Sequence, residues 1–350
     1  MMKKLNVMVV FGGQSGEHEV SLMSAASVLK VMNREKYNII PVGITKDGIW
    51  KHYDGPIDKI PTGEWESLGK NQEFISLSKN NVHSIDLVFP ILHGPFGEDG
   101  TIQGLLEMVG IPYVGAGVLA SAVAMDKAMT KKLCIAENIP QAQYITVLHS
   151  SYIKKQAEYV QEIEEKLGYP VFVKPANLGS SVGISKAKTS QELREAMKKA
   201  FEYDRKIVVE AFIDGREIEC SVLGNDEATA SLPAEIIPSH EFYDYKDKYF
   251  DGTSRFQIPA DLPETVVKEV QQLALKVYKL MDCSGLARVD FFVERQKNQV
   301  YFNEINTMPG FTKISMYPKM WEATGLSYEA LIDKLIALAV ERFKGRPQRY

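Results

Sequence analysis

The sequence predicts an α/β protein whose open, mostly parallel N-terminal sheet is followed by two α+β units. Strand-like and helical segments alternate through the first 122 residues, an order typical of an open α/β sheet. At 350 residues the chain is too long for one hydrophobic core, so two or three domains are expected. Its 45% hydrophobic and 25% charged residues are ordinary for a globular protein. We place the domains at residues 1–122, 123–217 and 218–350.

Composition and charge argue against several classes of protein. The net charge of −4 disfavours a general nucleic-acid binder. The three cysteines form no CxxC pair, which disfavours a disulfide framework or a zinc site and fits a reducing compartment. No apolar run reaches the ~20 residues of a membrane span. The opening MMKKLNVMVVFGG lacks the longer apolar region of a signal peptide. We therefore expect a cytoplasmic protein without a membrane segment.

In the first domain, both glycine-rich turns follow strands. The apolar run at 5–11 ends at Gly12, and the run at 85–92 leads into HGPFGEDG at 93–100. Ligands on open parallel sheets bind beyond the carboxyl ends of the strands, where both turns fall. The GGQSGE turn lacks GxGxxG spacing, which disfavours a Rossmann dehydrogenase. The other expected elements are a helix at 18–33, a strand at 37–44, a helix at 101–109 and a short strand at 112–114.

The second and third domains mix strands and helices. The second begins with a helix at 120–138 that carries Lys127, Lys131 and Lys132. The remaining elements expected there are a helix at 154–167, strands at 169–174 and 207–212, and a helix at 190–202, and a further strand at 217–223 leads into the third domain. The third domain is expected to hold a long loop at 237–258, a helix at 264–281, a hairpin from 288 to 306 and a C-terminal helix at 328–343.

The hairpin RVDFFVERQKNQVYFNEIN is the most informative stretch. If it folds about Lys297, Asp290 lies opposite Glu304 and Arg288 lies opposite Asn306. Side chains directly opposite in such a pair sit roughly 5 Å apart, where like charges repel. Two carboxylates and a carboxamide on one face suit magnesium, which prefers hard oxygen ligands. The alternative is a solvated hairpin in which Arg288 neutralises both acids.

The loop KPANLGSSVG at 174–183 follows an apolar strand. Its glycines let backbone N–H groups approach an anion, and Ser180 and Ser181 add hydroxyl donors. Lys174 can reach a phosphate as a point charge. The loop is no P-loop, because GxxxxGK[ST] is absent. An ordinary glycine-serine hairpin turn is the alternative.

Four other residues could each have either a functional or a purely structural role. Glu17 precedes a helix and could be a cap, since acids there favour the helix dipole. His93 could be a satisfied histidine in a tight turn. Glu210 and Glu217 flank the turn between two domains, where a carboxylate could accept a hydrogen bond from an adenine amino group or a ribose hydroxyl. Spacing alone favours solvent-exposed acids at both positions.

The aromatic loop HEFYDYKDKYFDG at 240–252 lies inside a polar connection. Long structured loops in compact domains are often functional lids. A lid would exclude water from a reactive intermediate and place Lys248 over phosphates. By composition alone, a disordered loop is an equally good interpretation.

Taken in order, these motifs closely resemble the D-alanine–D-alanine ligase family of ATP-grasp enzymes, over essentially the whole chain. The most specific segments are SGEHEVSL (15–22), HGPFGEDGTIQG (93–104), MDK (125–127), KPANLGSSVG (174–183), YDYKDKY (243–249) and NEINTMPGFT (303–312). The resemblance implies the ATP-grasp fold, with the nucleotide between the second and third domains. It also implies ATP, two Mg²⁺ ions that Mn²⁺ can replace, D-alanine as substrate, peptidoglycan precursor synthesis and a homodimer.

The resemblance further implies roles for individual residues. The implied ATP-binding residues are Lys127, Lys174, Ser180, Ser181, Glu210, Ala211, Phe212, Ile213, Glu217, Phe242, Lys248, Phe292 and Asn303, with Phe242 and Phe292 on either side of the adenine. The implied metal ligands are Asp290, Glu304 and Asn306. The implied substrate and catalytic residues are Glu17, His93, Ser180, Tyr249, Arg288, Gly310, Ser315 and Met316. Among these, Glu17 would take the ammonium of the first D-alanine, and Arg288 with the Gly310 backbone would stabilise an oxyanion.

Tyr249 carries the specificity inference. In the resembling enzymes a tyrosine at this lid position accompanies D-alanine as second substrate, whereas related D-alanine–D-lactate ligases replace it. The dipeptide is therefore favoured over the depsipeptide, and another ATP-grasp carboxylate–amine ligase is a further alternative. Leu178 departs from family members that carry an acid within the serine loop, so a carboxylate link to Ser180 is absent.

Overall fold

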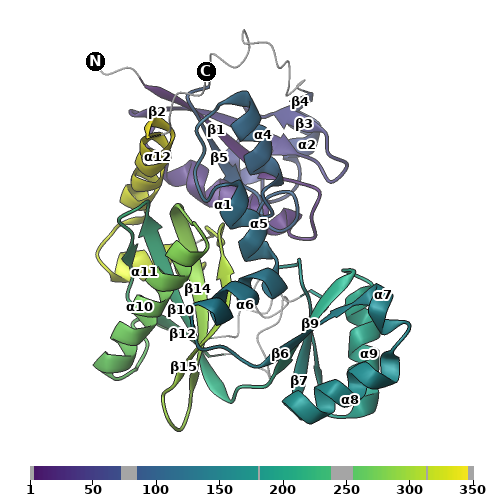
Figure 1. The fold of residues 1–350 in the computed structure, drawn as a ribbon. Helices are drawn as coiled ribbons and strands as arrows, with labels where there is room; N and C mark the ends of the chain where they lie inside the picture. The colour runs from purple at the N-terminus through teal and green to yellow at the C-terminus, as the bar shows by residue number, and fades with distance from the viewer. Residues whose placement is uncertain (1–3, 72–84, 180–181, 238–254, 313, 346–350) are drawn as a thin grey trace.

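The structure is a computed structural model that describes residues 4–71, 85–179, 182–237, 255–312 and 314–345. Its described strands form three sheets, and one of them lies beside the helices α7, α8 and α9 (Figure 1). The N-terminal sheet lies above the other two, which stand side by side below it. No helix in these ranges is long and apolar enough to cross a membrane.

The N-terminal sheet has the order β4-β3-β2-β1-β5. Its parallel core, in agreement with the sequence prediction, is β1 (Leu5–Gly12) between β2 (Tyr37–Ile44) and β5 (Leu87–Ile91). The antiparallel strands β3 (Trp50–His52) and β4 (Lys70–Asn71) extend one edge. The smaller helical elements here are η1 (Ile57–Lys59) and α2 (Trp65–Leu68).

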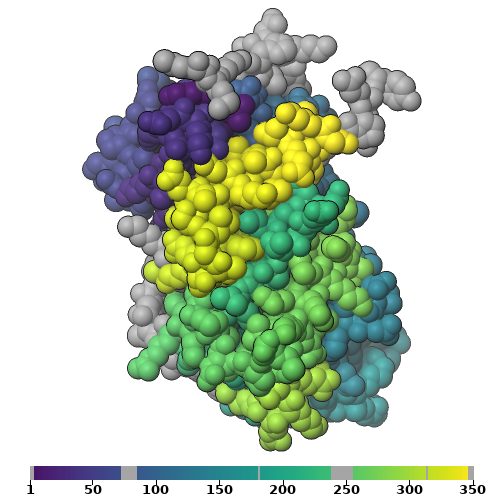
Figure 2. All heavy atoms as spheres, turned by 90° about the vertical axis from the view of Figure 1, so that its left-hand side faces the viewer, coloured from purple at the N-terminus to yellow at the C-terminus, as the bar shows by residue number. Residues whose placement is uncertain are grey.

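Helices cover both faces of β1, which is why its apolar residues run without interruption. Val7 and Val9 pack with α1 (His18–Val31) and with the C-terminal helix α12 (Tyr328–Lys344). Met8 and Val10 face α4 (Thr101–Val109). In Figure 2 the yellow C-terminal segment accordingly lies across the purple N-terminal part and the green part below it. The strand expected at 112–114 is reduced to a single bridge between Val88 and Tyr113.

The expected helix at 120–138 is wrong as a single element. It is two helices, α5 (Val118–Met125) and α6 (Lys127–Ala136), and Asp126 between them has extended backbone angles. The Asp126 carboxylate accepts hydrogen bonds from the N–H groups of Ala128 and Met129, as an N-cap does. Lys127 therefore opens α6, and its backbone N–H donates to Ala176 O at 2.9 Å. This break fixes the first lysine of α6 beside the loop after β7.

The second sheet, β6-β9-β7-β8, is antiparallel throughout. Its strands are β6 (Tyr144–Leu148), β7 (Val171–Pro175), β8 (Ser185–Ala187) and β9 (Lys206–Ala211). The helices beside it are α7 (His149–Tyr152), α8 (Gln156–Leu167) and α9 (Ser190–Phe201). Val160 and Leu193 pack from α8 and α9 onto Val171 and Val209. The helices therefore cover one face of the sheet (Figure 1), while the other face is left to the site.

The third sheet has the path β13-β12-β10-β14-β15, with β11 paired to β10. Its strands are β10 (Gly215–Gly224), β11 (Thr229–Ala230), β12 (Ala234–Ile237), β13 (Arg255–Gln257), β14 (Gly285–Glu294) and β15 (Val300–Asn306). Its remaining helices are α10 (Glu264–Leu280) and α11 (Met316–Ala323). Along β14, Val289 and Phe291 join the apolar core under α10, so the alternate residues Arg288 and Asp290 lie on the opposite face.

The hairpin register agrees with the prediction. Arg288 pairs with Asn306, and Asp290 pairs with Glu304. A register shift follows, because Phe291 pairs with Phe302 and leaves Asn303 as an extra residue. Such a β-bulge bends the strand and changes the direction of a side chain. The bulge lets Asn303 and Glu304 both border the space between the second and third sheets.

Candidate active site

A pocket forms where the two glycine-rich turns of the first sheet meet the β14–β15 hairpin. It is built from the start of α1, the turn after β5, the loop after β7, the hairpin and the segment that leads into α11. Its lining residues are Glu17, His93, Glu98, Gly179, Glu219, Phe256, Arg288, Glu304, Asn306, Met308, Pro309, Gly310, Thr312, Ile314, Ser315 and Met316. We call it the substrate pocket.

A second cavity, of about 350 Å³, lies between the second and third sheets. Its volume is within the range of small-molecule pockets. Its lining residues include Phe172, Lys174, Ile184, Glu210, Ala211, Phe212, Ile213, Glu217, Phe292, Asn303 and Glu304. We call it the nucleotide cavity. Glu304 borders both spaces, so the hairpin stands where they meet.

On the hairpin, Arg288 is tied to two carboxylates. Its Nε and one terminal nitrogen each donate to Asp290 at 2.7 Å, and its Nε lies 3.2 Å from Glu219 Oε2. Asn306 Nδ2 also donates to Asp290, at 3.0 Å. Burial alone would lower the pKa of Arg288, but Asp290 and Glu219 raise it well above its usual value. The guanidinium is therefore a fixed positive charge at the floor of the substrate pocket.

The hairpin acids fit a magnesium site. Asp290 is buried, Glu304 and Asn306 border the pocket, and all three offer hard oxygen ligands. Within the described ranges no three His, Cys, Asp or Glu side chains gather as a complete metal cluster. Magnesium commonly takes one or two protein carboxylates and completes its shell with phosphate oxygens and water. The donor set therefore suits a cation that arrives with a phosphate, and Arg288 neutralises Asp290 in the geometry seen here.

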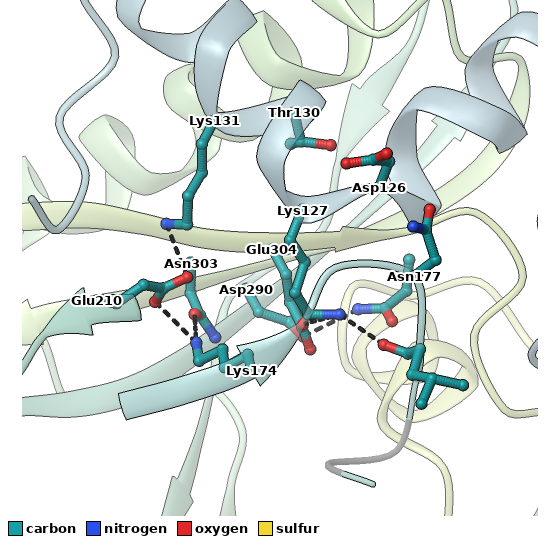
Figure 3. A network of polar contacts seen from close by, with 12 residues as sticks. Asp126, Lys127, Thr130, Lys131, Lys174, Asn177, Glu210, Asp290, Asn303 and Glu304 are labelled. Atoms are coloured by element: carbon teal, nitrogen blue, oxygen red, sulfur yellow. Dashed lines mark hydrogen bonds and ion pairs between the residues drawn. The ribbon is translucent and has the colours of Figure 1, made fainter. Parts of the chain in front are cut away.

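Three lysines and one buried glutamate line the side of the site nearest α6 (Figure 3). Lys174 Nζ donates to Glu210 Oε2 at 2.8 Å and to Asn303 Oδ1 at 3.3 Å. Lys131 Nζ lies 3.3 Å from the other carboxylate oxygen of Glu210. Lys127 Nζ donates to the Leu178 carbonyl at 2.5 Å and lies 3.8 Å from Glu304 Oε2. Lys127 and Lys174 thus flank the hairpin acids.

The alternative of a solvent-exposed acid is wrong for Glu210, whose side chain is 5% exposed. Burial alone would raise the pKa of Glu210, but the charges of Lys131 and Lys174 lower it. Burial lowers the pKa of Lys131, while Glu210 raises that of Lys174 against the effect of its own burial. Lys131 was not among the expected site residues. Its spacing of four from Lys127 places both on one helix face, which was the available indication.

We expect Lys131→Met to weaken ATP binding and to destabilise the protein. Glu210 would keep Lys174 as its remaining lysine, holding it more tightly and away from phosphates, so KM for ATP should rise about tenfold. Losing one cation beside a buried carboxylate should cost about 3 kcal/mol in the free energy of unfolding. The checks are steady-state kinetics and urea unfolding. Lys132→Met, one residue on and exposed, is the control, and equal effects in both variants would contradict this role.

The nucleotide cavity brings together most of the expected adenosine residues. Ala211, Phe212 and Ile213 follow Glu210 at its edge, and Glu217, Phe292 and Asn303 lie across from them. Phe172, which was not expected, also lines it, with its ring centroid 6.2 Å from that of Phe212. Its alternation with Val171 and Val173 places it on the same face as Lys174, an indication present in the sequence.

Glu17 is buried beside two glycines. It occupies the N-cap position of α1, as expected from the sequence, but its side chain makes no capping hydrogen bond to the helix. A Cβ atom on Gly94 would lie 2.6 Å from Glu17 Oε2, and one on Gly179 would lie 2.8 Å away. Gly94 also has a φ of +74°, which favours glycine. Both turns approach closely enough to hold this carboxylate at the substrate pocket, with Gly179 coming from the serine loop.

Glu98 is a second carboxyl group of the substrate pocket that was not expected. It accepts a hydrogen bond from the Gly94 N–H at 2.6 Å. Burial, followed by the nearby charge of Glu17, raises the pKa of Glu98 to about 8. The acid-rich run HGPFGEDG was the sequence indication that this turn has a use beyond packing. Two close carboxyl groups favour a site that receives a positive charge.

His93 is buried with a partner for each ring nitrogen. Nδ1 lies 3.0 Å from the Met308 carbonyl oxygen, and Nε2 lies 3.1 Å from Ser24 Oγ. Burial lowers the pKa of His93 to about 4. The ring therefore links the first sheet to the segment after β15 as a neutral group at the edge of the substrate pocket.

This pKa makes stability fall at acidic pH. Unfolding returns His93 to its ordinary pKa of 6.5, so the unfolded chain binds a proton that the folded chain excludes between pH 6.5 and about 4. The contribution of neutral His93 to the free energy of unfolding is complete above pH 6.5 and is lost as the pH falls toward about 4. Between pH 7 and pH 5 it should amount to about 2 kcal/mol. Urea unfolding of wild type and His93→Gln at both pH values checks this, and an identical pH dependence in the two proteins would contradict it.

Gly310, Ser315 and Met316 line the far side of the substrate pocket. Ser315 Oγ accepts from the Thr312 N–H at 2.9 Å and lies 2.8 Å from Thr312 Oγ1, which closes the segment into a compact turn. Met316 is buried at the start of α11. The expected residues Ser180, Ser181, Phe242, Lys248 and Tyr249 lie outside the described residues. Asp290 and Lys127 border neither main cavity, although Lys127 lines a small space with Glu98, Glu304 and Asn306.

Comparisons with known proteins agree with this arrangement. The family model described as D-ala D-ala ligase N-terminus matches residues 6–116, and that described as D-ala D-ala ligase C-terminus matches residues 133–337. The D-alanine–D-alanine ligase of Acetivibrio thermocellus is 53% identical, with 100% of both chains covered. That of Caldicellulosiruptor bescii is 52% identical over 97% of this chain and 96% of its own.

Solved structures give the same family. The VanG D-Ala:D-Ser ligase from Enterococcus faecalis has a TM-score of 0.87 and 41% identity, covering 96% of this chain and 100% of its own. The D-alanine-D-alanine ligase from Coxiella burnetii has a TM-score of 0.85 and 41% identity, covering 97% of this chain and 95% of its own. The chain belongs to the D-alanine–D-alanine ligase family and has its ATP-grasp fold.

Proposed function

We propose that this protein uses ATP to join two D-alanines through a D-alanyl phosphate intermediate, supplying D-alanyl-D-alanine for peptidoglycan precursors. The observation that carries the proposal is the position of Glu304, which borders both the nucleotide cavity and the substrate pocket. A phosphate at the end of the nucleotide cavity would thereby lie next to a carboxylate bound in the substrate pocket. The relatives of similar length named as D-alanine–D-alanine ligases support the choice of substrate.

ATP binding is assigned to the nucleotide cavity. Phe172 and Phe292 border the adenine, and the edge from Glu210 to Ile213 offers it backbone groups. Glu217 accepts from the ribose. Lys127 and Lys174 bind phosphates, because their ammonium groups flank the hairpin and both contact the site's carbonyl or carboxylate oxygens. Ser180, Ser181, Phe242 and Lys248 join this set through the family resemblance.

The metal ligands are assigned to Asp290, Glu304 and Asn306. Two Mg²⁺ ions, or Mn²⁺ in their place, would neutralise phosphate charge during phosphoryl transfer. The protein's own part is to keep these oxygen ligands on one rigid hairpin. A cation bound to Asp290 would compete with Arg288 for this carboxylate, and the guanidinium would then be available to the substrate.

In the first step, Glu17 binds the ammonium of one D-alanine and so directs its carboxylate toward the nucleotide cavity. A carboxylate oxygen forms a bond to the γ-phosphorus, the bond to the ADP oxygen breaks, and an acyl phosphate results. Burial and the charge of Glu17 raise the pKa of Glu98 to about 8, so near pH 7 Glu98 is largely protonated and the negative charge that faces the ammonium is that of Glu17. Holding both reactants in this geometry replaces a bimolecular encounter with an intramolecular one.

In the second step, the neutral amine of another D-alanine forms a bond to the acyl carbon, phosphate leaves with its bonding electron pair, and the proton lost by the nitrogen goes to the leaving phosphate. The carbonyl oxygen becomes negative in the transition state. We assign its stabilisation to Arg288 and the Gly310 N–H, and the lining of the substrate pocket by both residues supports this assignment. Ser315 binds the carboxylate of the second substrate with Met316 beside it. Ser180 and Tyr249 connect Glu17 to the lid in the resembling enzymes.

D-Alanine is our choice for the second substrate, on the strength of Tyr249. The similar structure named as a D-Ala:D-Ser ligase makes D-serine the first competitor to test, followed by D-lactate. We further propose the domain limits 1–122, 123–217 and 218–350, a homodimer and a cytoplasmic location.

The test is ADP release by the purified protein with ATP and Mg²⁺. The arms are no amino acid, L-alanine, D-alanine, D-alanine with D-serine, and D-alanine with D-lactate, each with mass analysis of the product. Release that requires D-alanine and yields the dipeptide supports the proposal. A mixed product that outcompetes the dipeptide would change the second substrate, and ATP binding without D-alanine-dependent release would remove the reaction.

A further inference from the structure

A buried serine on α1 is hydrogen-bonded to the segment after β15. Ser24 is 0% exposed, and its hydroxyl contacts His93 in the turn after β5. The Phe311 N–H donates to Ser24 Oγ at 3.2 Å, and His93 Nε2 lies 3.1 Å from the same oxygen. His93 Nδ1 in turn lies 3.0 Å from the Met308 carbonyl. Four residues from three segments remote in sequence, Ser24, His93, Met308 and Phe311, are thus joined by one chain of hydrogen bonds.

The protons in this chain can be placed by elimination. A carbonyl oxygen only accepts, so His93 Nδ1 carries a hydrogen and donates to Met308. The ring is neutral, so Nε2 is an acceptor, and the Ser24 hydroxyl must donate to it. The lone pairs of Ser24 Oγ are left to accept from the Phe311 N–H. Each member has one orientation only, and the buried chain is therefore rigid.

The two ends of this hydrogen-bond chain, at Met308 and Phe311, hold the residues on either side of Gly310. Met308 is fixed through its carbonyl and Phe311 through its N–H, so Pro309 and Gly310 are tethered on both sides. Gly310 itself lines the substrate pocket with Arg288. A hydrogen-bond donor stabilises an oxyanion only if its N–H points at the position that the oxyanion will occupy. Ordering from both sides is a means of setting that direction.

We infer that Ser24 is a positioning residue that, with His93, orients the Gly310 N–H toward the oxyanion of the condensation step. This inference rests on the proposed ligase reaction. Ser24 touches neither substrate nor nucleotide in this assignment, and its effect passes through the backbone of residues 308–311.

The first experiment compares kcat and KM for Ser24→Ala and wild type. A misdirected oxyanion donor should lower kcat by about 100-fold. KM for ATP should stay within about twofold, since the nucleotide cavity is lined by other residues. A tetrahedral phosphinate analogue of the dipeptide should bind about 100-fold less tightly, whereas D-alanine binding should change little.

Ser21→Ala is the matched control. Ser21 is also fully buried on α1 and also makes two hydrogen bonds, accepting from the Gly12 N–H and donating to the Ile91 carbonyl. It has no bond to residues 308–311, so its loss should lower stability comparably while kcat stays within about threefold. A kcat for Ser24→Ala within threefold of wild type would overturn the inference. An equal fall in kcat in Ser21→Ala would also overturn the inference.

The second experiment measures the protonation state and tautomer of the His93 ring in the wild-type protein. The sequence holds six histidines, and ¹⁵N-labelled histidine with His93→Gln for assignment identifies the His93 ring. We expect a neutral ring with its hydrogen on Nδ1 at pH 6. A protonated ring or a hydrogen on Nε2 would overturn the inference, even if Ser24→Ala failed to fold. Absence of D-alanine-dependent ADP release in wild type would instead remove the proposed reaction, and the ring measurement would remain informative about the chain.

Discussion

Asp290→Asn and Glu304→Gln should each lower kcat by about 10³-fold or more and leave the protein folded. These carboxylates face one another across the hairpin, and the proposed Mg²⁺ ions would bind there. Each substitution keeps the shape of the side chain but removes the negative charge that a divalent cation needs. Phosphoryl transfer depends on positioning and charge neutralisation more than on any covalent role of the protein, so this loss should be severe.

The measurement is ADP release over a range of Mg²⁺ concentrations, with thermal unfolding to confirm the fold. Glu294→Gln is the matched control, because Glu294 lies four residues beyond Asp290 on β14 and outside both main cavities. It should keep kcat within about twofold of wild type. The apparent affinity for Mg²⁺ should weaken in Asp290→Asn and Glu304→Gln alone. Full activity in either soluble variant would remove the metal assignment.

The sequence predicted the hairpin well because its information is local. Alternation sets which residues share a face, and a short polar turn sets the register, so the pairing of Asp290 with Glu304 followed from spacing. The bulge at Asn303 did not follow. An extra residue in one strand depends on how the sheet bends over its neighbours, and no short pattern encodes that.

The break at Asp126 could have been predicted and was not. Residues 120–138 contain apolar and basic positions compatible with one helix, and periodicity gave no reason to end it. Asp126 is nevertheless a favoured N-cap residue type, and its bonds to two backbone N–H groups end α5 and start α6. Local capping outweighed helix propensity here. The result places Lys127 at the opening of a helix, facing the loop after β7.

Burial of charge could not be predicted from spacing alone. Glu210 reads as a surface acid in its strand, because alternation shows only that it faces away from Val209. Its burial arises from three separated segments: the strand itself, Lys131 on α6 and Lys174 on β7. Glu17 is similar, since two glycines from different turns approach its carboxylate. Such sites are products of tertiary packing, and the family resemblance, rather than periodicity, indicated them.

Arg288→Ala should lower kcat by about 10³-fold and also destabilise the protein. Arg288 is the partner of buried Asp290 through two hydrogen bonds and lies 3.2 Å from buried Glu219. Removing it takes the proposed oxyanion donor from the substrate pocket and leaves the carboxylates of Asp290 and Glu219 without their shared cation. Breaking such a buried group costs about 3–5 kcal/mol in the free energy of unfolding.

Arg288→Lys separates the two effects. Lysine keeps the positive charge but cannot make the planar, two-pronged contact, so stability should recover by about half while kcat stays about 100-fold down. Added Mg²⁺ should restore part of the stability of Arg288→Ala, because Asp290 and Glu304 then share a cation, but should not restore its kcat. Lys297→Ala, at an exposed lysine on the turn of the same hairpin, is the control. If Arg288→Lys turned over like wild type, the guanidinium would be a structural partner of Asp290, and the oxyanion would depend on the Gly310 N–H without it.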